Sequence, residues 1–306
     1  MRGALVTLVE REDRNGQVRF HPVDVRAVFF TDADGRYRID SAPLGDYYVV
    51  AVPQNPGLSA DGRPNRTGFR ITYHPSAATV REATAVTVNV HAPQTANITV
   101  LPARLSMMAG TVLTSTGEPA AGGTLRVTHG DNLFGFGSTG IKLSASGAFS
   151  IAGVAPGTYF LRFSEGPWPP PRSVEIPLIS GATVVVADTD VTNIRVRPIH
   201  MVRGTGRVII DPASRARFRP DAFTVGSTPI DFEGNPGPQR PGVLREDLTF
   251  EFRTWPGPGR VRVLPEDGDW MIASVHYRGA DVTRTGIDFV QGVVISGIEV
   301  ELARRR

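Results

Sequence analysis

The sequence predicts an all-β protein made of tandem antiparallel β-sandwiches. Three observations predict this fold. Short segments alternate apolar and polar residues, which is typical of half-buried strands; examples are Val86/Val88/Val90, Ile194/Val196 and Ile298/Val300/Leu302. Glycine and proline turn signals recur about every 8–12 residues, the spacing found in sandwiches. Helical periodicity with capping residues is absent from every long window, so helices are not expected.

One pattern occurs three times, about 100 residues apart, which is the spacing of tandem domains. Each copy has a tight turn, a short alternating strand, a Pro/Gly turn and a second alternating strand; the copies span 32–52, 146–163 and 248–263. We interpret each copy as a hairpin, with the second turn one residue longer in the third. Alternation places one aromatic residue of each copy in the core: Tyr37, Phe149 and Phe250.

A second landmark precedes the repeated pattern. The middle copy opens with Ala109-Gly110-Thr111-Val112-Leu113, and the last copy with Val202–Val208, whereas the first copy has only the later piece, Gly3–Leu8. The first sandwich is therefore expected to lack its opening strand and to expose an unpaired edge, which another chain or an upstream segment would cover. The expected domains are residues 1–102, 103–200 and 201–306.

The motif order G-x-V, G-x-P, D-G-x-Y/F-x-I and P-x-G-x-Y resembles the carboxypeptidase regulatory-like domain, a relative of transthyretin-like, collagen-adhesin B-type and starch-binding-like sandwiches. The resemblance is strongest in the middle copy, where Gly110-Thr111-Val112 and Gly117-Glu118-Pro119 match and where Gly157-Thr158-Tyr159, preceded directly by Pro156, supplies the G-x-Y part of the last motif. It implies Ig-like (prealbumin-like) sandwiches in a non-catalytic role in secreted or envelope proteins of bacteria. The third copy matches weakly at the repeated pattern.

Composition removes several classes of function. The chain has no cysteine, which excludes disulfides, thiolate metal sites and cysteine nucleophiles. No apolar run approaches the roughly 20 residues that span a bilayer, and no secretory signal is visible at the start. The pI is about 9.6 at a net charge of only +3 because Lys142 is the single lysine. Arginines alternate with acidic residues, so nucleic-acid binding is not expected.

No catalytic constellation emerges from the spacing of reactive residues. The six histidines are far apart and none lies in a zinc-hydrolase motif. The match to G-x-G-x-x-G at 135–140 is followed by a strand-like run rather than a helix, so we interpret it as a flexible glycine loop. We therefore expect neither an enzyme nor a bound cofactor or metal.

Two further chemistries were weighed. Asp32-x-Asp34-Gly35 begins like a calcium loop, but Arg36 and Pro43 stand where the EF-hand pattern requires oxygen ligands. A turn explains these residues. A weak surface calcium site is the remaining alternative. Collagen-adhesin B-type domains often contain a Lys–Asn isopeptide bond. Such a bond would require Lys142, which lies outside the expected early strand, so no isopeptide bond is expected.

The sequence favours a binding surface over an active site, because loops on a rigid sandwich commonly carry the residues that recognise a ligand. Exposed aromatic rings can stack on sugars, and the candidates are Phe134, Phe136, Trp168 and Tyr73. The segment Gln54–Asn65 is expected to be a long loop, either functional or mobile. The predicted function is a structural, adhesive or display array in the cell envelope or outside the cell. The alternatives are polysaccharide binding and service as an accessory module of an envelope enzyme or transporter, with a polysaccharide or an envelope protein as partner.

Overall fold

A computed structural model describes residues 1–14, 17–23, 29–40, 42–89, 93–114, 116–130, 139–164, 179–230, 242–264 and 269–304. The fold is all-β, as predicted, with several sheets and only two short 3-10 helices among the described residues, Pro212–Arg217 and Pro220–Ala222. Two compact units make up the chain. One contains Met1–Thr111, Arg126–Leu161 and Thr183–Arg195, and the other contains Val112–Leu125, Arg162–Ala182 and Val196–Arg306.

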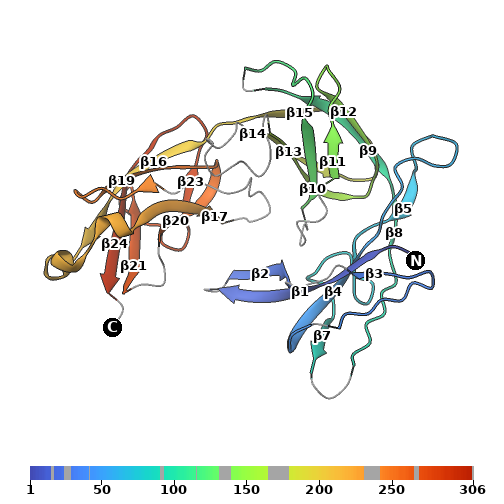
Figure 1. Ribbon diagram of the computed structural model, residues 1–306, viewed down its shortest axis with the longest axis horizontal. Coiled ribbons are helices and arrows are strands. Elements are labelled where there is room, and N and C mark those ends of the chain that lie inside the picture. The colour runs from blue at the N-terminus through green and yellow to red at the C-terminus, as the bar shows by residue number, and fades with distance from the viewer. Residues whose placement is uncertain are drawn as a thin grey trace. The chain divides into compact units, whose positions relative to one another are not determined.

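The N-terminal repeat is built on one six-stranded sheet (Figure 1). Its order is β2-β1-β4-β6, with β3 also paired to β1 and β7 to β4. The strands are β1 (Leu5–Arg14), β2 (Gln17–Pro22), β3 (Phe29–Phe30), β4 (Gly45–Val52), β6 (Thr72–Tyr73) and β7 (Ala85–Val88). Alternate residues of the central strands face a core of Val6, Leu8, Tyr47 and Val49. A separate two-stranded sheet joins β5 (Thr67–Phe69) to β8 (Pro102–Arg104).

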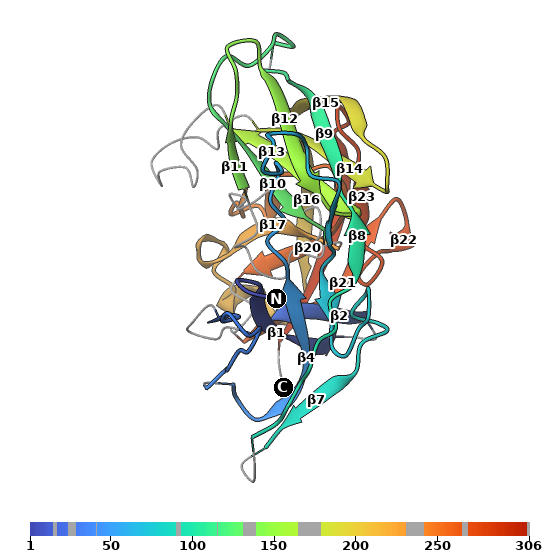
Figure 2. The ribbon, with the colours of Figure 1, turned by 90° about the vertical axis from the view of Figure 1, so that its right-hand side faces the viewer.

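The middle repeat forms a seven-stranded sheet of order β11-β10-β13-β14-β15-β9-β12. In Figure 2, β15, β9 and β12 run side by side. The strands are β9 (Ser106–Val112), β10 (Thr124–His129), β11 (Thr139–Lys142), β12 (Ala148–Val154), β13 (Gly157–Ser164), β14 (Ile179–Val186) and β15 (Val191–Ile199).

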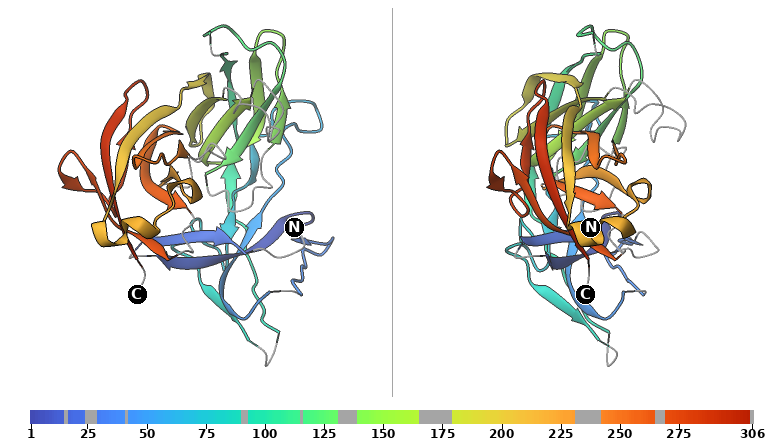
Figure 3. Two further views of the ribbon diagram at one scale, coloured as in Figure 1. Left: turned by 60° about the vertical axis from the view of Figure 1, so that its left-hand side comes forward. Right: turned by 90° about the vertical axis from the view of Figure 1, so that its left-hand side faces the viewer.

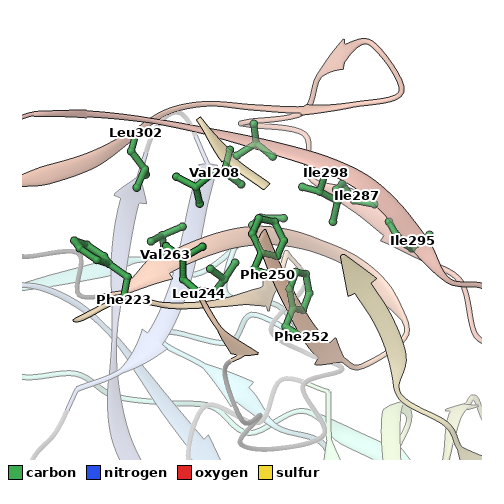
Figure 4. Packing of buried hydrophobic residues seen from close by; sticks show 14 of the residues in the cluster. Val208, Phe223, Leu244, Phe250, Phe252, Val263, Ile287, Ile295, Ile298 and Leu302 are labelled. Carbon is green, nitrogen blue, oxygen red and sulfur yellow. The ribbon is translucent and has the colours of Figure 1, made fainter. Parts of the chain in front are cut away.

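The last repeat is a sandwich of two sheets, ordered β19-β16-β24-β21-β22 and β18-β17-β20-β23 (Figure 3). The strands are β16 (Val202–Ile210), β17 (Thr224–Pro229), β18 (Gly242–Val243), β19 (Thr249–Thr254), β20 (Gly257–Leu264), β21 (Trp270–Tyr277), β22 (Ala280–Asp281), β23 (Ile287–Phe289) and β24 (Ile295–Arg304). Side chains from both sheets, among them Phe250 and Val263, point into a shared core (Figure 4). One pair departs from the expected antiparallel pattern, because β16 runs parallel to β24.

The three predicted aromatic positions lie in or against the core. Phe149 is 5% exposed and Phe250 is 1% exposed, while Tyr37 is half-buried against the first core. Period-2 alternation therefore identified the correct face of each segment.

The prediction that each repeated pattern is a hairpin was wrong. In the last repeat, β19 belongs to one sheet and β20 to the other, so the chain crosses the sandwich between them. In the middle repeat, β12 pairs with β9, while β13 lies between β10 and β14. Alternation reveals which face of a strand is buried but not which strand is its neighbour, and this is why the crossing was missed. The connection has two residues in both repeats, so the third is not longer.

The turn that opens the repeated pattern has the same geometry in all three copies. Gly35 and Gly147 adopt φ of 80° and 68°, and Leu248 adopts φ of 65° at the equivalent place. In each copy the amide of this residue donates to the carbonyl three positions earlier, at 2.9–3.1 Å. The Asp-Gly and Ser-Gly signals thus supply the left-handed residue that the turn requires, whereas Leu248 adopts it at a steric cost.

The strand expected at Tyr37–Ile39 does not form, since residues 36–40 have no strand pairing within the described chain. The equivalent segments in the other repeats pair with the opening strands β9 and β16. The first repeat has no such strand among its described residues, in agreement with the predicted truncation. A strand requires a hydrogen-bonded neighbour, so residues 36–40 stay irregular even though Tyr37 and Ile39 contact the core.

Candidate functional site

The predicted ligand-binding aromatic residues are not brought together among the described residues. Phe134, Phe136 and Trp168 lie outside the described ranges. Tyr73 is 1% exposed and packs with Val9 and Val50. Thr72-Tyr73 forms β6, which pairs with β4, and this pairing turns the Tyr73 ring into the core rather than toward a ligand. The structure therefore corrects the choice of Tyr73 as a stacking platform.

The reactive side chains that drew attention in the sequence have structural partners. Oδ1 of Asp32 accepts the amides of Asp34 and Arg36 at 2.9 and 2.8 Å, as in an Asx turn. The ring of His129 packs edge-on against Tyr159, with 4.9 Å between centroids. Lys142 is exposed on β11. Within the described ranges, no three His, Asp or Glu side chains gather as a metal site would require.

The strongest polar cluster joins Arg66, Asp190 and the backbone of Met107. The guanidinium of Arg66 binds the Asp190 carboxylate with both terminal nitrogens, and Nη2 lies 2.9 Å from Oδ2. The Met107 amide donates to Oδ1 of the same carboxylate at 2.9 Å. Such a bidentate pair fixes orientation as well as distance. The cluster therefore connects the segment before β5 to the start of β9 and to the turn before β15.

This cluster has a clear electrostatic effect on its carboxylate. The Arg66 guanidinium, followed by the Met107 amide, lowers the pKa of Asp190 to about 2. The same contact raises the pKa of Arg66. Both side chains remain partly exposed, at 43% and 31%, so water screens the pair. An ionised carboxylate saturated by three donors is suited to holding backbone in place rather than to accepting a proton.

The segment Gln54–Asn65 is largely irregular, as expected for a loop, with one isolated bridge between Leu58 and Pro64. Residues of β12 approach this loop closely. A Cβ on Gly57 would lie 3.3 Å from the Ala152 carbonyl oxygen, and one on Gly153 would lie 2.8 Å from the Cα of Gly57. Near the start of the loop, Asn55 donates to the Phe69 carbonyl at 2.7 Å and accepts the Phe69 amide at 3.0 Å. The loop is therefore packed against β12 and closed by its own side chain.

Sequence reasoning missed the Arg66–Asp190 cluster. The two residues are 124 positions apart, and arginine and aspartate are both common in this chain. The only local signal is the bend of the loop that carries Arg66, and this does not specify a partner.

The buried hydroxyl groups act within the framework. Ser180 is 3% exposed and donates to the Leu113 carbonyl at 2.7 Å. Ser227 and Thr254, both buried, bond to each other. Ser106 is the exception among the described residues, because its buried hydroxyl has no hydrogen-bond partner. Ser180, Ser227 and Thr254 thus hold separate segments together, and none of these described hydroxyl groups lies in a reactive constellation.

Outer faces of the last repeat carry ion pairs across neighbouring strands. Arg203 on β16 lies 2.7 Å from Glu251 on β19, and Arg207 on β16 lies 2.5 Å from Glu299 on β24. Such exposed pairs typically contribute less than about 1 kcal/mol each. None of the described helices is long and apolar enough to cross a bilayer.

Comparison with known proteins gives matches to solved structures alone. No protein-family model and no curated protein matches the sequence. Among solved structures, a streptococcal ancillary pilin is 11% identical over 100% of this chain and 94% of the pilin, with a TM-score of 0.28. The minor pilin of Streptococcus agalactiae is 14% identical over 65% of this chain and 83% of its own, with a TM-score of 0.27.

The Bacillus anthracis TIE protein is 12% identical, and the match covers 99% of this chain at a TM-score of 0.23. This chain spans 48% of the length of the TIE protein. With identities of 11–14% and TM-scores below 0.3, these likenesses carry no argument about the present chain.

Proposed function

We propose that the chain is a non-catalytic array of β-sandwich repeats with a structural, adhesive or display role, in the cell envelope or outside the cell. The observation that carries this proposal is the threefold repetition of one turn and of the aromatic residue that follows it, with a strand after the turn in two of the copies. In two copies this unit pairs with a preceding strand in the same way, Phe149 opposite Gly110 and Phe250 opposite Gly206. Among the described residues, the scaffold is repeated but no polar site is repeated with it. This is typical of proteins that space or display other groups.

The polar contacts support the same proposal. The Asp190 carboxylate, the Ser180 hydroxyl and the Ser227–Thr254 pair each join separate strands or loops. These groups are used to hold backbone in place. We further propose that the domains are residues 1–102, 103–200 and 201–306 and that they are of the carboxypeptidase regulatory-like type. The main core of the last domain lies wholly within Val202–Leu302.

Two experiments test the proposed location and role. An antibody against the chain should label intact source cells, and brief protease treatment of those cells should remove the label without lysis. Labelling that requires permeabilisation would contradict the envelope location. The purified chain should then be applied to arrays of polysaccharides and of envelope proteins, where saturable binding to an envelope protein is the expected result.

The same arrays address the carbohydrate alternative. Saturable polysaccharide binding that is lost in Trp168→Ala or Phe136→Ala would favour that reading. The variant Phe149→Leu serves as a control for stability, because Phe149 lies in the core and its substitution should not alter a surface site. Co-purification with an enzyme or a transporter from source cells would instead favour the accessory-module reading.

A further inference from the structure

The first repeat contains an empty strand position, which becomes visible when the three copies are aligned on their shared turn. The turn residues Gly35, Gly147 and Leu248 are each followed, two positions later, by Tyr37, Phe149 and Phe250. In the middle and last copies, the segment carrying this aromatic residue pairs antiparallel with the opening strand, β9 or β16. In the first copy, no backbone hydrogen bond joins residues 37–40 to any other segment that the structure describes.

The segment on the opposite side of this position also forms no strand, although its Thr99 amide donates to the Pro75 carbonyl at 2.9 Å and its Asn97 carbonyl lies 2.7 Å from Nδ1 of His74. Asn97-Ile98-Thr99-Val100 matches Asn193-Ile194-Arg195-Val196 and Gly297-Ile298-Glu299-Val300. Those two later segments belong to β15 and β24, which lie directly beside the opening strands β9 and β16. In the first copy, residues 93–100 form no strand, although Ala96 and Ile98 pack against the first core. Two segments that flank a strand elsewhere therefore flank none here.

The core beneath this position is less well covered than in the other repeats. Phe149 and Phe250 are 5% and 1% exposed, whereas Tyr37 is only half-buried. The hydroxyl of Tyr37 donates to the Ala96 carbonyl and so bridges the two flanking segments. Phenylalanine, which occupies this position in the other copies, cannot form that bond. The tyrosine hydroxyl thus closes the position when no strand is present.

In the middle and last copies this position is occupied by a strand, and they show which residues such a strand must carry. Gly110 lies opposite Phe149, and a Cβ on Gly110 would lie 2.1 Å from the Ile194 carbonyl oxygen. Gly206 lies opposite Phe250, and a Cβ there would lie 2.0 Å from the Ile298 carbonyl oxygen. A strand placed between Tyr37 and Ile98 meets the equivalent groups. It must therefore carry glycine opposite Tyr37 and a small or apolar residue two positions to either side, as in Met108-x-Gly110-x-Val112 and Gly204-x-Gly206-x-Val208.

We infer that the first repeat accepts an extended segment of another polypeptide between residues 36–40 and residues 96–100, in which a small or apolar residue stands two positions before a glycine and valine stands two positions after it. The inserted strand supplies backbone hydrogen bonds to residues 37–40 and to those backbone groups of residues 96–100 that face the position, and it covers Tyr37, Ile39 and Ile98. It displaces the Tyr37–Ala96 hydrogen bond. This inference does not rest on the proposed function, since it depends only on strand pairing within the first repeat.

The test uses the full chain and a fluorescein-labelled synthetic peptide that copies Arg104–Thr114. The control peptide is identical except for Gly110→Val, which adds the Cβ that the neighbouring carbonyl excludes. Fluorescence anisotropy measures affinity, and hydrogen exchange locates the bound peptide. We expect saturable binding of the glycine peptide, protection of the amides at 36–40 and 96–100, and at least tenfold weaker binding of the valine peptide.

A variant of the first repeat distinguishes strand insertion from non-specific binding of the peptide. Tyr37→Phe removes the hydroxyl that closes the position and leaves the ring, so it should bind the glycine peptide several-fold more tightly. Equal binding of the two peptides would overturn the inference, as would an absence of binding to both wild type and Tyr37→Phe. Protection confined to the middle repeat, where the peptide could replace β9, would overturn it as well.

Discussion

Nη2 of Arg66 donates a hydrogen bond to Oδ2 of Asp190 at 2.9 Å, although the two residues are 124 positions apart in the sequence. Arg66 follows the irregular loop of the first repeat, and Asp190 immediately precedes β15. A second guanidinium nitrogen and the Met107 amide reinforce this contact between distant segments of one compact unit.

Acid should weaken this contact. The pKa of Asp190 falls from an ordinary value of 3.8 to about 2 on folding, so its contribution is complete above pH 4–5 and is lost as the pH falls toward 2. Asp190→Asn should lower the urea midpoint at pH 6, and the difference from wild type should shrink between pH 4 and pH 2. Asp188→Asn, a neighbouring exposed position, should leave the midpoint unchanged. An unchanged midpoint in Asp190→Asn at pH 6 would contradict this role.

Removal of the unpaired hydroxyl of Ser106 should stabilise the chain. Ser106 is 2% exposed and its oxygen has no partner, so the folded state bears an uncompensated desolvation cost. Ser106→Ala is expected to raise the free energy of unfolding by about 1 kcal/mol. Ser180→Ala, which breaks the bond to Leu113, should lower it by a similar amount. Denaturant titrations of the two variants should move in opposite directions.

Gly206 and Gly110 should tolerate no side chain. A Cβ at either position would lie about 2 Å from a backbone carbonyl oxygen of the neighbouring strand, which cannot yield without shifting that strand. Gly206→Ala and Gly110→Ala should each destabilise the fold by roughly 1–3 kcal/mol or more. Ile209→Thr, an exposed β-branched substitution on β16, should cost far less. Chemical unfolding followed by tryptophan fluorescence measures all three, and a neutral Gly206→Ala would refute the close approach.

Leu248 combines a packing benefit with a conformational cost. Its side chain contacts the last core, but its φ of 65° is unfavourable for any residue with a Cβ. Leu248→Ala loses the packing and keeps the strain, whereas Leu248→Gly loses the packing and relieves the strain. The glycine variant should therefore be the more stable of the two by about 1 kcal/mol. Thermal unfolding of the pair gives this difference directly, and equal stabilities would show that the turn is unstrained.

Much of the fold follows from local pattern. Alternation predicted the burial of Phe149 and Phe250, and the Asp-Gly and Ser-Gly pairs predicted the turns at Gly35 and Gly147. Strand pairing was harder, because the same alternation suits a hairpin and a crossing between sheets. The chain decides between these through long-range partners such as β16 for β19, which local sequence does not specify.

The candidate site was less predictable for a related reason. Tyr73 was a candidate for an exposed ring, but pairing of β6 with β4 turns its ring inward. Arg66 and Asp190 have no motif, since their meeting depends on where two distant segments pack. Leu248 shows the reverse case, in which the turn forms without the glycine that normally marks it.

The parallel pairing of β16 with β24 has a mechanical consequence. Val202 begins β16 and Arg304 ends β24. Because the two strands are parallel, these two residues lie at opposite ends of the pair. Tension applied through these two ends loads the interstrand hydrogen bonds in shear. They must then rupture together rather than unzip one after another, which makes the last repeat resistant to being pulled apart along the direction of the chain.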